Sequence, residues 1–208
     1  MQKPGEIPLE DRPSDLGSRF VGRATVALVL MTLTIGLVLV VASLSWWDLY
    51  VGSPWNQMER HYLGNGCVDG GGCWDYTDSE TLRSFFPPTY GLVLTALALS
   101  VFELAFLVLA TFERRFRVGI LVTGILGSVT LLVAPIYFYF ARISYSQGFL
   151  KSGFSGSYTE RGTTYIWGGG TGWFMAPFVA IFFLVATIVV FFVAPHIKPL
   201  GSERVSSS

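Results

Sequence analysis

Four long runs of apolar residues constrain the fold of this chain more than any other feature. The first run, 24–45, contains no charged residue. Because an α-helix rises about 1.5 Å per residue, a run of this length crosses a hydrocarbon core of roughly 30 Å. Three further apolar runs cover 90–112, 118–141 and 173–194. The pattern predicts four membrane-spanning helices within a membrane domain that extends over 21–195.

A cleaved signal peptide is the alternative interpretation of the first run. Arg19 and Arg23 precede it, and Ala42 and Ser43 are small residues near its end. The apolar part of a signal peptide is about 7–15 residues long, and this run is longer. Its length therefore favours a span that stays in the protein.

The charged residues support a membrane protein and argue against other classes. They make up 13% of the 208 residues, and their formal sum is zero. A typical soluble domain has about 25% charged residues. A nucleic-acid-binding protein needs a basic patch to neutralise phosphates, so we expect no nucleic-acid partner. The segments 1–20 and 196–208 are polar, and we predict a disordered tail at 1–20 and a short mobile tail at 196–208.

The positions of the basic residues predict the orientation of the spans. Arg23 precedes the first run, 113–117 between the second and third runs holds three arginines, and Lys198 follows the fourth. These places share one side if four spans alternate, and the positive-inside rule makes that side cytoplasmic. We therefore predict a multi-pass protein of the cell membrane with both termini cytoplasmic. The loops 46–89 and 143–172 then lie outside.

The two cysteines of the chain, Cys67 and Cys73, both fall in the first outer loop. A pair in an oxidising compartment predicts a structural disulfide, which by loop entropy stabilises the fold by about 2.4 kcal/mol. A redox-active pair would need the Cys-x-x-Cys spacing and a second pair. A metal site with His61 and Asp69 would lack the short ligand spacing typical of zinc. We expect neither a metal nor a cofactor.

Enzyme signatures are missing from the sequence. The chain contains no Gly-x-Ser-x-Gly, no P-loop and no His-Glu-x-x-His, and no histidine lies inside a predicted span. We therefore predict a protein that is not an enzyme. The glycine-rich run 168–172 is interpreted as a flexible joint that lets the fourth span pack closely. Before the second span, a capping box at 77–80 predicts a short helix that Pro87 and Pro88 end.

Each span carries small residues at helical spacing, which predicts a compact bundle because helices in lipid associate through close contacts. These predicted packing rows are Thr25, Thr32, Gly36 and Ser43 in the first span, Ala96, Ser100, Glu103 and Ala110 in the second, Thr123, Gly127, Thr130 and Ala134 in the third, and Ala176, Ala180, Thr187 and Ala194 in the fourth.

Glu103 is an acid near the middle of the second span. An isolated charge there is heavily penalised, so the side chain must find polar partners inside the bundle. Thr32 and Thr187 come to similar depth on their own packing rows, and we predict that one or both bond Glu103. Two hypotheses remain open: a polar contact that holds helices together, and a proton or cation site.

The outer loops add a resemblance to a known family. Trp55 is followed by Cys67 and Cys73 in the larger first loop, and the basic residue Arg83 lies just before the second span. With four spans, this pattern resembles the claudin and peripheral-myelin-protein type of tetraspan membrane protein. The resemblance implies a β-containing outer domain stapled by the disulfide, which sits on the bundle and mediates lateral or cell-to-cell contact.

The expected fold is thus an all-α membrane protein, a four-helix bundle with a small extracytoplasmic domain that contains β-structure. We expect a non-enzymatic protein that contacts other membrane or extracellular proteins, or a second copy of itself, through the first outer loop. Trp55, Trp74 and Arg83 are the candidate binding residues. Alternatively, Trp46, Trp47 and Trp74 anchor that loop at the lipid headgroups. The alternative function is a small transporter, channel or accessory subunit that uses Glu103.

Overall fold

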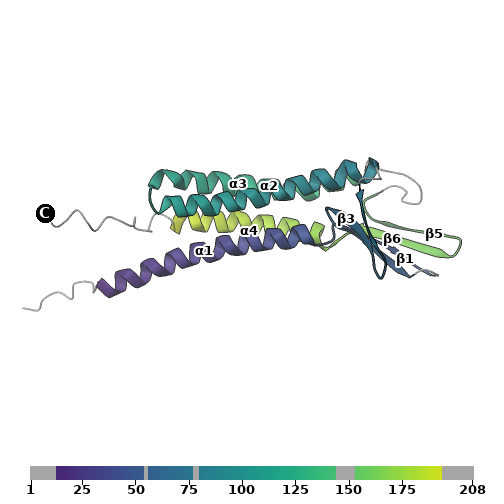
Figure 1. Cartoon of the computed structure of the whole chain (residues 1–208), viewed down its shortest axis with the longest axis horizontal. Coiled ribbons are helices and arrows are strands. Elements are labelled where there is room, and N and C mark those ends of the chain that lie inside the picture. The colour runs from purple at the N-terminus through teal and green to yellow at the C-terminus, as the bar shows by residue number, and fades with distance from the viewer. Residues whose placement is uncertain (1–12, 54–55, 77–79, 144–152, 194–208) are drawn as a thin grey trace, which may run out of the picture.

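Four long helices lie side by side, and a six-stranded sheet covers one end of them (Figure 1). The computed structural model describes residues 13–53, 56–76, 80–143 and 153–193, with backbone alone at 13–21, 80 and 81. The helices are α1 (Pro13–Ser43), α2 (Glu80–Ala110), α3 (Arg117–Ile143) and α4 (Thr171–Val193), and a short 3-10 turn η2 (Arg114–Phe116) joins α2 to α3. The first residues of α1 and the last of α4 lie away from the sheet.

All four helices are long and apolar enough to cross a membrane, which confirms the four predicted helices. Their ends differ from the predicted ones. The first helix begins at Pro13, inside the segment predicted to be disordered, so that prediction is wrong for 13–20. Proline is well suited to the first position of a helix because its missing N–H would have no partner there. Extending an existing helix is also easier than nucleating one.

The helix α2 passes through Pro87 and Pro88 without ending, so the predicted break is wrong. A proline inside a helix leaves the carbonyl four residues earlier without its N–H partner. For Pro88 that carbonyl belongs to Ser84, and the hydroxyl of Tyr137 in α3 donates to it at 3.1 Å. The neighbouring helix thus supplies a donor that the proline removes. One continuous helix results in place of the two predicted pieces.

The inward face of α1 also differs from the predicted packing row. Thr25, Thr32 and Ser43 are exposed on the outside of the bundle. The side chains that face the other helices recur every three or four residues, as an inward helix face requires; they are Ala27, Met31, Thr34, Val38 and Val41. The threonine that α1 buries is therefore Thr34 and not Thr32, and its hydroxyl donates to its own helix at Leu30 O, 2.8 Å away.

The packing rows of the other three helices are largely buried as predicted; the buried members are Ala96, Ser100, Glu103, Ala110, Thr123, Gly127, Ala134, Ala176, Ala180 and Thr187. Ala194 lies outside the described residues. Small residues bring α3 and α4 together: a β-carbon on Gly124 would overlap the side chain of Thr187. The Ser128 hydroxyl, which donates to Ala180 O at 2.8 Å, adds a polar bond between these two helices.

The sheet is antiparallel and draws on both loops. Its order is β4-β3-β2-β1-β6-β5. The first loop supplies β1 (Trp47–Val51), β2 (Gln57–His61), β3 (Asn65–Val68) and β4 (Cys73–Asp75), and the second supplies β5 (Gly156–Glu160) and β6 (Thr163–Gly169). The predicted β-structure is confirmed, and it is larger than the first loop alone. Strand β1 lies at the centre because it pairs with both β2 and β6.

The glycine-rich run 168–172 spans the end of β6 and the start of α4, so the prediction that it is flexible is wrong. Gly169 ends β6, and Gly172 lies in the first turn of α4. A β-carbon would approach within 2.5 Å of Ser45 O at Gly170 and within 2.8 Å of the Trp46 ring at Gly172. The glycines therefore permit close approach between α4 and the end of α1, which is the packing role that the sequence predicted.

Cys67 and Cys73 form a disulfide, as predicted. They occupy directly paired positions of β3 and β4, with their Cα atoms 4.1 Å apart. Gly70, in the turn between them, has a φ of +77°, a conformation that glycine adopts without a steric penalty. The disulfide thus closes the last hairpin of the first loop.

Candidate functional site

The two faces of the sheet have different environments. Alternate residues of each strand point to opposite faces, so the pairing register assigns every residue to one face. The bundle-facing side contains the buried residues Trp47, Leu49, His61 and Trp167. The other side, the open face, contains Asp48, Tyr50, Met58, Arg60 and Ile166, together with both cysteines. Any contact made by the free side of the sheet must use the open face or an edge strand.

A row of apolar side chains crosses the open face. Tyr50 on β1 is paired with Met58 on β2 and with Ile166 on β6, so the three side chains lie next to one another across the central strands. Tyr50 is 39% exposed and Ile166 is 49% exposed, while Met58 is partly buried. We name these three residues the outer row. Their exposure leaves a strip of apolar surface on the open face of the sheet.

The bundle-facing side is fixed by an aromatic cluster around His61. Its imidazole lies 5.0 Å from the Trp47 ring, 5.7 Å from Trp74, 6.1 Å from Tyr76 and 5.7 Å from Phe86 of α2, measured between ring centroids. Aromatic pairs at these separations stabilise beyond the area that they bury. Because Phe86 belongs to α2, the cluster joins the sheet to the bundle.

Trp46 and Trp47 are buried in the protein, so the alternative that they anchor the loop at lipid headgroups is wrong for these two residues. The Trp46 Nε1–H donates to Val41 O at 3.0 Å, and the Trp47 Nε1–H donates to Phe154 O at 3.3 Å. Both indole donors therefore have partners inside the protein. The sequence places these tryptophans next to a predicted span, and periodicity alone does not distinguish the lipid surface from the core.

Arg142, in the last turn of α3, is a residue that the sequence analysis missed. It is 2% exposed, and its guanidinium carbon lies 4.9 Å from the centre of the Trp47 ring. A desolvated arginine over a tryptophan face is a favourable cation–π arrangement. The residue follows the third predicted span directly, and the tyrosines and phenylalanines before it were the available signal of an aromatic environment. Its role is to connect α3 to the sheet.

The predicted binding residues are spread over different surroundings. Trp74 points to the bundle-facing side, partly buried against His61 and over Gly66, where a β-carbon would come within 2.6 Å of its ring. Arg83 is exposed on the first turns of α2. Trp55 lies outside the described residues. The structure does not bring Trp74 and Arg83 together with the outer row.

Glu103 is completely buried between the helices. Neither of its carboxyl oxygens has a hydrogen-bond partner among the described residues. Thr187 approaches the carboxyl group from α4, but its hydroxyl donates to Phe183 O at 2.9 Å. Thr32 is exposed and so is not a partner, which corrects that part of the prediction. The bundle thus holds an acid with unsatisfied acceptors near its middle.

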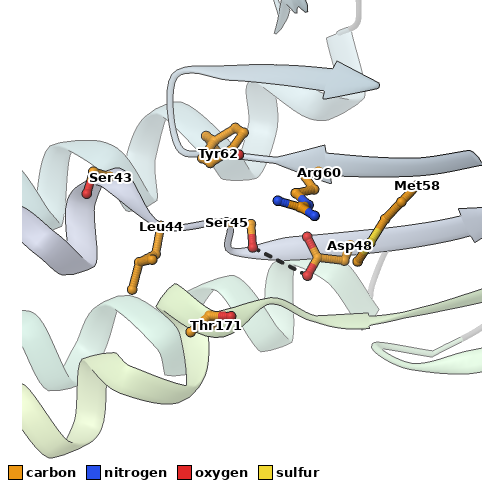
Figure 2. Close-up of a pocket in the computed structure, with 8 residues that line it drawn as sticks. All are labelled: Ser43, Leu44, Ser45, Asp48, Met58, Arg60, Tyr62 and Thr171. Carbon is orange, nitrogen blue, oxygen red and sulfur yellow. Dashed lines mark hydrogen bonds between the residues drawn. The ribbon is translucent and has the colours of Figure 1, made fainter. Parts of the chain in front are cut away.

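A pocket of about 390 Å³ opens where the sheet meets the helices (Figure 2). Its wall includes Ser43 of α1, Thr171 of α4, Asp48 of β1 and Arg60 of β2. The Ser45 hydroxyl donates to Asp48 Oδ2 at 3.3 Å, and burial raises the pKa of Asp48 above its ordinary value. The sequence analysis missed this pair of charges because they become neighbours only through strand pairing.

The residues weighed as a metal site do not converge. Both cysteine sulfurs are bonded to each other, and they lie on the open face, whereas His61 lies on the bundle-facing side. Within the described ranges, no cluster of three or more histidine, cysteine, aspartate or glutamate side chains could hold a metal ion. Comparison with known proteins finds no matching family model and no matching curated protein.

Proposed function

We propose that this chain is an integral protein of the cell membrane, with the sheet outside and both termini in the cytoplasm. The first support is the outer surface of the four helices, which exposes large apolar side chains; the most exposed include Phe102, Phe140, Phe178 and Phe192. Contiguous apolar surface of this kind is unfavourable in water and favourable in lipid. The second support is the position of three basic residues on the side away from the sheet, where the positive-inside rule places them. Arg23 lies at the start of the apolar stretch of α1, and Arg114 and Arg115 lie in η2 between α2 and α3.

The proposed function is protein–protein contact, or lateral assembly with further copies, through the open face of the sheet. The observation that carries it is the outer row. The buried aromatic cluster already supplies apolar burial on the other side of the sheet, so Tyr50 and Ile166 remain available to a partner. Tyrosine and methionine are enriched in interfaces relative to the rest of protein surfaces. The resemblance to claudin-type tetraspan proteins implies the same function.

The sheet is also preorganised for binding. The disulfide closes β3 on β4, and the aromatic cluster fixes β1 and β2 against α2. A surface that is already ordered loses less conformational entropy when it meets a partner, so more of the contact energy appears as affinity. The outer row therefore presents its three side chains in a fixed register.

Photo-crosslinking in native membranes tests this function. A crosslinking amino acid at Tyr50 is expected to give adducts, and one at Gln57, exposed at the end of β2 with its side chain on the opposite face, is expected to give far fewer. The change Ile166→Asn should reduce the Tyr50 adducts about fivefold or more, because it removes the apolar neighbour on β6. The control Thr159→Asn, also on the open face, should leave them unchanged. A protein that gives no adducts at Tyr50 would refute the proposal.

Glu103 supports a second candidate function, a proton or cation site in a small transporter, channel or accessory subunit. The supporting observation is its complete burial with both oxygens lacking hydrogen-bond partners among the described residues. Buried acids inside membrane helices are functional candidates by default. Reconstituted vesicles test it: Glu103→Gln should abolish a measured flux while the protein remains folded. A matched change, Ser100→Ala, removes a polar group one turn away and should leave the flux intact.

A further inference from the structure

The pocket beside Asp48 and Arg60 lies at a defined depth. The apolar stretch of α1 ends at Ser43 and that of α4 begins at Thr171, and both residues line the pocket. If these helices cross a membrane, the pocket lies at the headgroup level of the outer leaflet. This inference therefore rests on the membrane placement proposed above. The pocket volume of about 390 Å³ falls in the range of roughly 300–1,000 Å³ that is usual for small-ligand sites.

One negative and one positive side chain meet in this pocket. Asp48 and Arg60 are directly paired across β1 and β2, and Figure 2 shows their side chains turned toward one another. Arg60 forms its ion pair with Asp69: a guanidinium nitrogen lies 3.1 Å from Asp69 Oδ2. Asp48 Oδ2 accepts from Ser45, whereas Oδ1 is buried and has no partner among the described residues. The pocket thus combines an unsatisfied anionic acceptor with a guanidinium that retains donors.

We propose that this pocket binds the headgroup of a phospholipid that carries a primary ammonium, such as phosphatidylethanolamine. The ammonium donates to the carboxylate of Asp48, and the phosphate accepts from the guanidinium of Arg60. Ser43 and Thr171 also line the pocket. The acyl chains continue along the apolar surfaces of α1 and α4.

The chemistry of the pocket favours this headgroup over others. A quaternary ammonium has no N–H to donate, so phosphatidylcholine forms no hydrogen bond with the carboxylate of Asp48. A purely anionic headgroup would meet Arg60 but would be repelled by Asp48. Hydrogen bonds between charged partners are the stronger class, and two such bonds at once would give the zwitterion its preference. Soluble phosphoethanolamine carries the same two groups without the acyl chains.

Lipid retention by the full-length protein tests the proposal. The protein is extracted in mild detergent, exchanged into equal amounts of phosphatidylethanolamine and phosphatidylcholine with matched acyl chains, and measured by native mass spectrometry. We expect about tenfold preference for the ethanolamine lipid in the wild type. Asp48→Asn should remove the preference without preventing lipid binding, and Arg60→Gln should weaken retention of both lipids. The control Glu160→Gln changes an exposed acid on β5 and should leave the preference intact.

Three outcomes would overturn the proposal: equal retention of the two lipids by the wild type, an unchanged preference in Asp48→Asn, or displacement of the lipid by soluble phosphoethanolamine at equal concentration. The last would identify a soluble zwitterion as the ligand. Crosslinking at Tyr50 separates this test from that of the proposed contact function, because Asp48→Asn leaves the outer row in place. Adducts that persist while the lipid preference fails would refute the headgroup site alone.

Discussion

The two faces of the sheet are made from the same six strands, yet they use their side chains differently. On the bundle-facing side, Trp47 and His61 are buried in a continuous aromatic cluster with residues of α2. On the open face, one position along from each, Asp48 and Arg60 are only partly buried. The difference teaches that stability is concentrated on one face, which leaves the other free to change its residues at little cost to folding.

The largest test of this comparison is Trp47→Ala against Tyr50→Ala. Removing Trp47 leaves a cavity next to His61 and takes away the ring under Arg142. We expect the free energy of unfolding to fall by about 3–5 kcal/mol. Tyr50→Ala should cost about 1 kcal/mol or less, because the ring is exposed. Denaturant unfolding followed by tryptophan fluorescence measures both, and equal losses would show that the two faces do not differ.

Removing the disulfide should have a smaller effect, and it tests an exception to the comparison between the two faces. Cys67 and Cys73 lie on the open face, but their bond acts mainly through the entropy of the unfolded chain and not through surface packing. The double change Cys67→Ser with Cys73→Ser should therefore lower stability by about 2.4 kcal/mol. Reducing agent added to the wild type should give the same loss in the same unfolding measurement. A loss close to zero would indicate that the hairpin is ordered without the bond.

A third test adds a single methyl group to the bundle-facing side. A β-carbon on Gly66 would come within 2.6 Å of the Trp74 ring, whereas nothing lies within 4 Å of one on Gly64. Gly66→Ala should then cost about 1–3 kcal/mol, as overpacking does. Gly64→Ala, two residues away, should be nearly neutral. Thermal unfolding of the two variants in parallel measures the difference between a position packed against the Trp74 ring and an open position in the turn between β2 and β3.

The smallest expected effect concerns Asp48 and pH. Its pKa in the folded protein is raised by burial above the ordinary value of 3.8, so the folded state holds the proton more tightly than the unfolded state. Stability from this group is therefore present at low pH and is lost as pH rises from about 3.8 through the folded pKa. In lipid-free detergent, Asp48→Asn should be stabilising at neutral pH, by under about 1 kcal/mol after solvent screening. The gain should vanish below the pKa of the unfolded state, and a gain that persists there would contradict this cause.

The sequence predicted the helices because the length of an apolar run and its lack of charge decide whether it can cross a membrane. It also predicted that Glu103 points inward, because an acid that faces lipid is strongly unfavourable, and Ser100 lies on the same side of the helix. It failed at Thr32. A threonine hydroxyl can donate to its own helix, as exposed Thr95 does to Gly91 O at 2.8 Å, so threonine is not forced inward. A row of small residues therefore indicates a contact only when another constraint accompanies it.

The break predicted at Pro87 and Pro88 failed for a different reason. The donor that Tyr137 supplies to Ser84 O comes from another helix, so no local pattern reveals it. The pocket could not be predicted from the sequence either, because Asp48 and Arg60 become neighbours only through the register of β1 on β2. The sequence thus predicts which segments form elements, while the candidate sites depend on how those elements pair.

Because β1 pairs with β6, one of its two partner strands is synthesised much later than β1 itself. Leu49 on β1 pairs with Trp167 on β6, and 167 − 49 places these partners 118 residues apart in the chain. At about 5–20 residues per second, a ribosome needs roughly 6–24 s to deliver the second after the first. During that interval the hairpins from β1 to β4 can form, but one side of β1 has no strand beside it. An open strand edge invites pairing with another chain. The nascent protein is therefore most exposed to mispairing after its first loop has left the ribosome, and its vulnerable interval ends when β6 arrives.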